Sequence, residues 1–256
     1  MIPFAGGTVD PLRWRTFENL VVVDAVTSSN DLASEIFEMY FSEEQELPPT
    51  VLIGEAQTAA RGRKGRWVAE PGRGLYLTVL RRIAPGEPMS LIPIAVGRWI
   101  REVLAEHAGL EASLKWPNDV YAGGRKLAGV LAESRTQGDE TYVAVGLGVN
   151  ALGPAASIGI ENATTVEQET GRPAPLAPLM QALLDRLDAE LSSPQWGREV
   201  EQWERVSLHR PGDRLTVRRD GEELSGEYRG LTPEGFLRLG TPGGETVCVA
   251  GELARW

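Results

Sequence analysis

The sequence contains few residues that could cross-link the chain through disulfides or metal ions. Among its 256 residues there is a single cysteine, Cys248, so no disulfide can form within the chain. The two histidines, His107 and His209, are not spaced as metal ligands, and no Ser/His/Asp set is evident. The sequence therefore predicts no zinc site, and its cysteine content is typical of a protein from a reducing compartment.

Long apolar runs and an excess of positive charge are also lacking. The longest apolar candidate, "LIPIAV", contains Pro93 and is far shorter than the roughly 18 residues that span a bilayer. The N-terminus lacks the cationic start and apolar stretch of a secretory signal, so we expect a cytoplasmic protein without a membrane role. The formal net charge of −10 argues against duplex DNA or RNA as the main partner.

Short β-branched segments alternate with amphipathic segments in the first two thirds of the chain. Apolar residues at helical spacing predict helices over residues 29–40, 87–107, 175–191 and 195–206. Strands are predicted over residues 19–24, 50–56 and 74–80, and again within 112–116, 119–134 and 141–151. The Gly-Gly pair in "AGGR" indicates a hairpin turn, so the second half of this sheet is predicted to be antiparallel.

The sequence pattern changes after "LHRPGD" to short strand-like segments with frequent Gly and Pro. This pattern predicts a small β barrel or meander. We therefore expect an α+β protein with two domains, residues 1–207 and 208–256. The large domain should hold a mixed, mostly antiparallel sheet with covering helices.

A basic segment, "RGRKGR" at 61–66, stands out in this acidic protein. Its four cations are Arg61, Arg63, Lys64 and Arg66, separated by two glycines. Arginines donate two hydrogen bonds to one anion and glycine lets the backbone approach it closely, so the segment suits phosphate or carboxylate oxygens. A solvated surface loop between two strands explains the same residues.

A second charged segment, "LKWPNDVYAGGRKLAGVLAES" at 114–134, places Lys115 and Lys126 on either side of the predicted hairpin. Lys126 precedes the apolar run "LAGVLA", so its stem should lie along buried surface, although an exposed lysine beside a turn is the commoner case. Asp119 could hydrogen-bond its own turn, or hold Mg²⁺ beside phosphates.

Two polar groups near the first helix are candidates for ligand contacts. "TSSN" at 27–30 caps that helix, and hydroxyls at a helix N-terminus can also hold a small polar group. Gln57 follows an apolar strand, where its amide could lie at an edge or pair with a buried donor and acceptor.

In this order the segments resemble the biotin protein ligase family, which attaches biotin to a lysine of a carrier domain. The resemblance runs from about residue 19 to the C-terminus. It rests on "TSSN", "EAQTAARGRKGR", "PGRGLYLTV", "LKWPNDVYAGGRKLAGVLAES", "VGLGVN" and the C-terminal "GDRLTVRRDG" to "GEL". It implies a mixed sheet with helices on one face, followed by a small SH3-like domain.

The resemblance also assigns roles to individual residues. The positions matching biotin contacts are Ser28, Ser29, Asn30, Gln57, Arg61, Gly62, Arg63 and Lys126. Those matching the nucleotide side are Arg61, Arg63, Arg66, Lys115, Asn118 and Asn150. Lys126, Arg61 and Lys115 are the expected catalytic cations, and Asp119 is the expected magnesium ligand.

The implied reaction uses ATP and Mg²⁺ to activate biotin as biotinyl-5′-AMP, and the implied acceptor is a lysine of a biotin carboxyl-carrier domain. A homodimer is compatible with this family, and with about 18 residues before the first strand we expect no DNA-binding domain. The chain departs from the family at Ala60, where glycine is common, and at Trp67 and Val68, which puts adenine stacking by an aromatic residue there in question. A lipoate or octanoate ligase and a non-catalytic biotin sensor remain as alternatives.

Overall fold

The computed structural model describes residues 1–62, 65–155 and 162–255, with the backbone alone for 66–68 and 255. The helices are α1 Ser29–Ser42, α2 Ile92–Ala108, α3 Val166–Thr170, α4 Leu176–Ser192 and α5 Trp196–Arg205. The strands before α2 are β1 Ile2–Phe4, β2 Gly7–Val9, β3 Asn19–Val26, β4 Thr50–Gly62, β5 Gly65–Ala69 and β6 Gly74–Arg82. Those after α2 are β7 Ser113–Lys115, β8 Asp119–Ala122, β9 Arg125–Gln137, β10 Glu140–Asn150, β11 Arg214–Arg219, β12 Glu222–Leu231, β13 Leu237–Thr241, β14 Gly244–Cys248 and β15 Glu252–Arg255.

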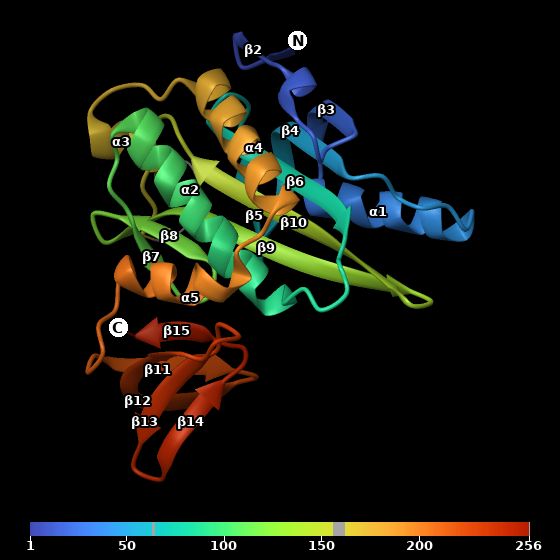
Figure 1. Cartoon of the computed structure of the whole chain (residues 1–256). Coiled ribbons are helices and arrows are strands. Elements are labelled where there is room, and N and C mark those ends of the chain that lie inside the picture. The colour runs from blue at the N-terminus through green and yellow to red at the C-terminus, as the bar shows by residue number, and fades with distance from the viewer. Residues whose placement is uncertain (63–64, 156–161, 256) are drawn as a thin grey trace.

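A mixed sheet of eight strands forms the centre of the larger part of the molecule (Figure 1). Its order is β3-β4-β6-β10-β9-β8-β7, with β5 paired to the distal end of β4. β3 pairs with β4 in parallel, whereas β4–β6, β6–β10, β10–β9, β9–β8 and β8–β7 are antiparallel. The predicted mostly antiparallel α+β fold is confirmed.

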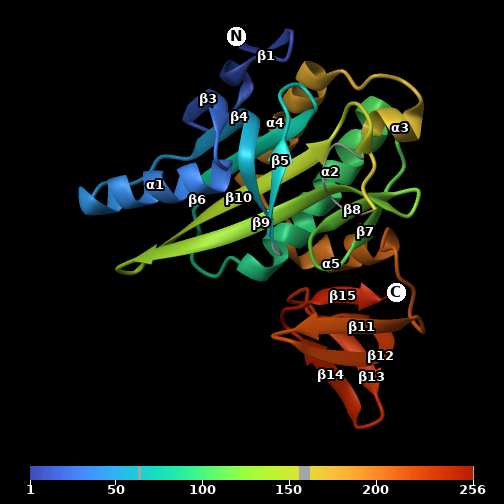
Figure 2. The ribbon, with the colours of Figure 1, turned by 180° about the vertical axis from the view of Figure 1, so that it is seen from behind.

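Side chains alternate between the two faces of the sheet because successive residues of a strand point to opposite sides. Val143 and Val145 belong to the main core, which α2 and α4 cover, whereas Ala144 belongs to a second cluster beneath α1. The two views in Figures 1 and 2 show α1 and α2 on opposite sides of the sheet. Helices therefore cover parts of both faces, which corrects the expectation of helices on one face.

The helix boundaries follow from local chemistry. Ser28 has an extended backbone and its side chain accepts a hydrogen bond from the Asn30 backbone N–H, so the predicted cap of the first helix is present. α2 begins at Ile92 rather than at residue 87, because a 3-10 turn over Met89–Leu91 precedes it and Pro93 lies in its first turn. It ends at Ala108 and is capped by Gly109, whose φ of 65° is readily adopted by glycine.

The basic segment was predicted as a loop between strands, but the strands extend into it. β4 continues to Gly62 and β5 begins at Gly65, with Arg61 opposite Arg66 in the ladder. β1, β2 and β5 were not predicted from the sequence. β1 and β2 are three residues each and β5 is five, which is too short for a clear alternation of apolar residues.

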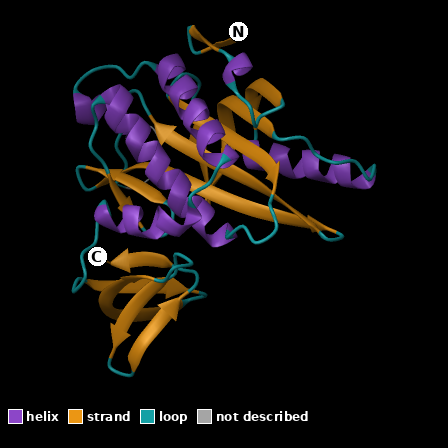
Figure 3. Cartoon of the chain, viewed as in Figure 1, coloured by secondary structure: helices purple, strands orange, loops and turns teal. Residues whose placement is uncertain are grey.

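A β-rich region with an order of β14-β13-β12-β11-β15 follows α5 (Figure 3). It is attached to the larger part by specific contacts. The Trp116 indole donates to the Gly235 carbonyl oxygen at 3.0 Å, and the Lys115 ammonium donates to the Leu253 carbonyl oxygen at 3.3 Å. The α5 carboxylate of Glu204 accepts from the Leu231 backbone N–H at 2.7 Å. These contacts place β15 next to the turn between β7 and β8.

Candidate functional site

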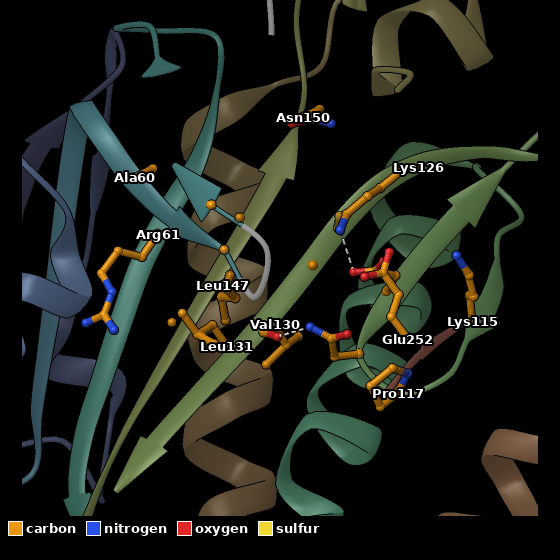
Figure 4. A pocket seen from close by; sticks show the side chains of 18 of the residues that line it. Ala60, Arg61, Lys115, Pro117, Lys126, Val130, Leu131, Leu147, Asn150 and Glu252 are labelled. Carbon is orange, nitrogen blue, oxygen red and sulfur yellow. Dashed lines mark hydrogen bonds and ion pairs between the residues drawn. The ribbon is translucent and has the colours of Figure 1, made fainter. Parts of the chain in front are cut away.

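A cleft of about 710 Å³ lies on the face of the large sheet that α1 covers in part (Figure 4). This volume is within the range of small-molecule binding sites. Residues from α1, β4, β8, β9, β10 and the C-terminal strands line it. The polar and charged lining residues are Ser28, Ser29, Asn30, Gln57, Arg61, Lys115, Asn118, Asp119, Tyr121, Lys126, Asn150, Asn162, Arg218 and Glu252.

Glycines keep the floor of the cleft open. On β10, Val145, Leu147 and Val149 face the main core, so Gly146 and Gly148 point to the cleft side. Gly146 lies opposite Thr78 on β6 and opposite Leu131 on β9. A Cβ at residue 146 would lie 2.0 Å from the Asn30 side-chain oxygen, so a larger residue would displace that side chain.

The end of the cleft beside α1 holds a buried polar network. The Ser29 backbone N–H donates to Gln57 Oε1 at 2.8 Å. Thr78 Oγ1 lies 2.7 Å from the Ser29 hydroxyl and 2.8 Å from Asn30 Oδ1. Since an amide oxygen accepts and cannot donate, Thr78 donates to Asn30 and accepts from Ser29. All four side chains are buried, so this end presents fixed donors and acceptors.

Arg61 leaves β4 next to this network and pairs with two carboxylates. Its guanidinium lies 2.6 Å from Glu133 Oε1 and 3.2 Å from Asp31 Oδ1. Glu133 also accepts from Asn30 Nδ2 at 2.9 Å. In Figure 4 the Arg61 side chain points away from Lys126, so the two cations occupy different ends of the cleft.

Lys126 and Asp119 form an ion pair at the other end of the cleft. Nζ of Lys126 lies 2.6 Å from Oδ1 of Asp119, and the two residues belong to β9 and β8. Gly129 lies opposite Asp119 in the ladder, where a Cβ would come 3.1 Å from that oxygen. The predicted hairpin therefore does bring Lys126 and Asp119 together.

Backbone contacts hold Lys126 on both sides. Its N–H donates to the Asn162 carbonyl oxygen, and its own carbonyl oxygen accepts from the Thr164 N–H, both at 2.8 Å. Residues 162–164 thus add a short parallel bridge to β9. Glu169 of α3 accepts from Thr164 and from Arg125, which ties this bridge to the hairpin.

Three other predicted residues also reach the cleft. Lys115 is buried, with Nζ 5.4 Å from the ring centre of Tyr121, which is within cation–π range. Asn118 Nδ2 donates to the Val130 carbonyl oxygen, so this amide anchors the β7–β8 turn to β9. Asn150 is buried at the end of β10 (Figure 4).

Burial raises the pKa of Tyr121, and the Asp119 carboxylate adds to this effect. Tyr121 therefore keeps its proton at neutral pH and lines the cleft as a neutral hydroxyl.

Not every predicted residue can be placed. Gly62 lines the cleft, whereas Arg63 and the Arg66 side chain lie outside the residues and side chains that the structure describes. Trp67, considered above for adenine stacking, has a described backbone in β5 alone.

Sequence reasoning missed several residues at the site, among them Tyr121 and Asn162, which line the cleft. Thr78 and Glu133 lie in strands whose pattern shows alternation but not partners, and Arg218 and Glu252 come from the C-terminal region. The glycines of "VGLGVN" were the signal that could have indicated an open floor, because glycine in a strand often marks a close approach of another group.

The cleft offers few groups that could bind a metal ion. Within the described residues no group of three or more His, Cys, Asp or Glu side chains could hold a metal ion. Asp119 and Glu252 both line the cleft. This donor set fits Mg²⁺ held by one or two carboxylates and by substrate oxygens, and it does not fit a cage made by the protein alone.

The cleft combines a polar end of fixed hydrogen-bonding groups with a cationic end, which suits an elongated ligand with a neutral polar head and an anionic group. A model of the biotin/lipoate A/B protein ligase family matches residues 23–150, and the chain belongs to this family. Within the described part of the chain, no helix has the length and apolar character of a membrane span.

Individual relatives agree with this assignment. The bifunctional ligase/repressor BirA of Escherichia coli is 30% identical over 215 residues, covering 79% of this chain and 65% of the relative's length. The biotin–acetyl-CoA-carboxylase ligase of Paracoccus denitrificans is 30% identical over 213 residues, covering 79% of this chain and 88% of the relative. The solved biotin protein ligase from Aquifex aeolicus in complex with biotin and ATP has a TM-score of 0.73 and 26% identity, covering 93% of this chain and 98% of that one.

Proposed function

We propose that this protein is an ATP-dependent biotin protein ligase. It would convert biotin and ATP to biotinyl-5′-AMP and pyrophosphate, and then transfer biotin to a lysine of a biotin carboxyl-carrier domain. The observation that carries this proposal is the single cleft that joins the buried network of Ser29, Asn30, Gln57 and Thr78 to the Lys126–Asp119 pair. The relatives named above support it.

The polar end of the cleft is the proposed site for the biotin head. The ureido group of biotin has two N–H donors and one carbonyl acceptor, and a buried network with fixed polarity can pair with such a group. The oxygen of Gln57 is engaged by the Ser29 backbone, so its NH₂ group is the part that would contact a ligand acceptor. Ser28, Ser29 and Asn30 come to this end from the start of α1.

The cationic end is the proposed site of adenylation. An oxygen of the biotin carboxylate attacks the α-phosphorus of ATP, and the bond to the pyrophosphate oxygen breaks. Negative groups meet in this step, so Lys126 and Lys115 would stabilise it by neutralising developing charge. Arg61, the third expected catalytic cation, rests instead at the α1 end of the cleft, where it pairs with Asp31 and Glu133. Lys126 is held in place by Asp119 and by its two backbone bonds, which lowers the cost of positioning it.

The second step needs an open route to the acyl carbon. The amine of the acceptor lysine attacks this carbon, the bond to the phosphate oxygen breaks, and AMP leaves while the amine gives up a proton. Asn118 and Asn150, with Arg63 and Arg66, are proposed on the nucleotide side on the strength of the family pattern. Magnesium, when bound beside Asp119, would screen the charge of the triphosphate oxygens.

Further properties are part of the same proposal. We place the boundary between the ligase domain and the SH3-like domain at residues 207 and 208, and we expect a cytoplasmic location. A homodimer is compatible with this assignment, and sedimentation of the purified protein would measure it.

Exchange of labelled pyrophosphate into ATP tests the proposal. We expect exchange with ATP, Mg²⁺ and biotin, and none when biotin is omitted, because the step is reversible and needs the acid. Exchange with lipoate or octanoate in place of biotin would assign the chain to the other branch of the family. Binding of biotin without exchange would show a sensor.

A further inference from the structure

We infer that Glu133 is a positioning residue for the acid substrate, because it links the guanidinium of Arg61 on β4 to the pocket amide of Asn30. This inference rests on the proposed function and deepens it. Glu133 contacts neither the Lys126–Asp119 pair nor the C-terminal strands in the described structure, so its influence should be confined to the α1 end of the cleft.

The two oxygens of Glu133 have different partners. Oε1 accepts from Nη2 of Arg61 at 2.6 Å, and Oε2 accepts from Nδ2 of Asn30 at 2.9 Å. Arg61 comes from β4 and Asn30 from α1, whereas Glu133 stands on β9, across the sheet from both. The side chain of Glu133 is 23% exposed, so it is shielded enough for both bonds to persist. One carboxylate thus fixes two groups from distant parts of the chain.

The Glu133 carboxylate is the main group that sets which way the Asn30 amide points, with a longer contact of 3.4 Å from Asn30 Nδ2 to the Leu131 carbonyl oxygen beside it. Thr78 donates to Asn30 Oδ1, and Glu133 accepts from Asn30 Nδ2. If the amide were flipped, its oxygen would face the carboxylate. Both groups are acceptors without a proton, so no hydrogen bond could form between them. A neutral glutamine could donate as well as accept, so only the longer contact to the Leu131 carbonyl oxygen would then oppose the flipped orientation.

The orientation of Asn30 affects the rest of the pocket. Asn30 contacts Thr78, Thr78 contacts Ser29, and the backbone of Ser29 donates to Gln57. Asn30 also packs directly on Gly146, which leaves its amide little space for another position. Disorder in the Asn30 amide would therefore alter the set of donors and acceptors that the substrate head meets.

Glu133 also determines where the Arg61 guanidinium rests. Arg61 lies between Glu133 and Asp31, which together carry more negative charge than the arginine neutralises. The substrate head that enters this end would therefore meet a guanidinium held in a fixed place on the wall of the cleft. Without the Glu133 charge, Asp31 alone would hold Arg61, at 3.2 Å.

The test is the kinetics of pyrophosphate exchange with the full chain carrying Glu133→Gln. We expect the KM for biotin to rise at least tenfold while the KM for ATP stays within twofold, because the altered contacts lie at the biotin end. Glu38→Gln on α1 is the matched control, since it removes the same charge from an exposed position of the helix that carries Asn30. The control should leave both KM values unchanged.

A second pair of variants tests the same link without changing Glu133. Thr78→Val removes the donor to Asn30 at nearly constant volume, and Thr78→Ser keeps it. We expect the KM for biotin to rise with valine and to be largely restored with serine. If Glu133→Gln does not fold, as judged by circular dichroism and melting temperature, an unchanged biotin KM in Thr78→Val still overturns the inference, because the orientation of Asn30 would then not matter.

The outcomes separate the inference from the proposed function. If the wild-type chain shows no biotin-dependent exchange, the proposed function falls and this inference falls with it. If the wild type is active, an unchanged biotin KM in Glu133→Gln overturns the inference alone. An equal rise of both KM values would also overturn it, because that result indicates a general loss of structure.

Discussion

Lys126 illustrates how one residue is prepared for a role at the site. Its ammonium pairs with Asp119, and its backbone is hydrogen-bonded to the backbone of Asn162 and Thr164. Both the charged end of the side chain and the backbone are therefore held. A lysine next to a hairpin turn would ordinarily be exposed and mobile, as residue statistics predict. Here the added bridge of residues 162–164 changes that outcome.

The first prediction concerns this residue. Lys126→Ala should lower the rate of adenylate formation by a factor of about 100 or more, because a positioned cation that stabilises developing charge contributes on this scale. The melting temperature should change little, since the lysine head lies in an open cleft. Single-turnover formation of biotinyl-5′-AMP measures the rate. A wild-type rate in the variant would remove Lys126 from the reaction.

Elements of the fold are joined by charge as well as by apolar packing. Arg98 of α2 and Glu199 of α5 are both buried and form two hydrogen bonds of 2.9 Å. Glu102 also contacts Arg98, and it accepts from Arg186 of α4 at 2.6 Å. Three helices on one face of the sheet are therefore connected through this cluster.

The second prediction concerns the contact between α2 and α5. Glu199→Gln should lower the free energy of unfolding by about 3 kcal/mol, because it leaves a buried arginine without its main counter-charge. Glu201→Gln on the same helix is the control. Its ion pair is with Arg205, and the side chains of Arg205 and Glu201 are 71% and 67% exposed. Exposed pairs of this kind contribute about 0.5 kcal/mol to the free energy of unfolding. Urea denaturation measures both values. Equal losses of unfolding free energy in the two variants would show that the buried Arg98–Glu199 pair contributes no more than the exposed pair.

At the scale of the whole molecule, the larger sheet and the C-terminal strands meet around the cleft. His209 lies between them and is 4% exposed, with its ring in edge contact with Tyr228. The pKa of His209 is lowered to about 4, mainly by burial; the Asp213 carboxylate opposes this shift and the charge of Lys115 adds to it.

The third prediction is the pH dependence of stability that follows. The unfolded chain would bind a proton at His209 near pH 6.5, whereas the folded chain would bind it near pH 4. Between these values the unfolded state holds more protons, so the free energy of unfolding falls as the pH falls from about 6.5 to about 4. Above this window the histidine is neutral in both states and has no effect.

Urea denaturation across that range would measure the effect. Wild type and His209→Gln are compared at each pH, because carboxylates titrate in both and their contribution cancels in the difference. We expect the wild type to lose more stability than the variant on acidification. The prediction would be wrong if the free energy of unfolding fell equally with pH in the wild type and in His209→Gln.

Much of the architecture could be predicted from local sequence signals. α1, α4 and α5 have a clear 3.6-residue apolar period, and their predicted limits agree with the structure to within two residues. The hairpin at "AGGR" was predicted from its Gly-Gly pair, and in the structure Gly123 and Gly124 both have the positive φ that such a turn requires. The limits of α2 were less accurate, because apolar spacing does not distinguish a 3-10 turn from the first turn of a helix.

The site was predicted in part. The sequence by itself determined the residue types and their order: the helix-capping serines, the glutamine after an apolar strand, the basic segment, and the lysines flanking a turn. These are local properties, and together they were sufficient to indicate the protein family. Tertiary structure alone decided that Glu133 joins Arg61 to Asn30, that Gly146 makes room for Asn30, and that Glu252 reaches the cleft from the C-terminal strands. Such contacts join residues that lie far apart in the sequence, 72 positions for Arg61 and Glu133 and 103 positions for Asn30 and Glu133. Their partners depend on strand register and packing, which no local pattern encodes.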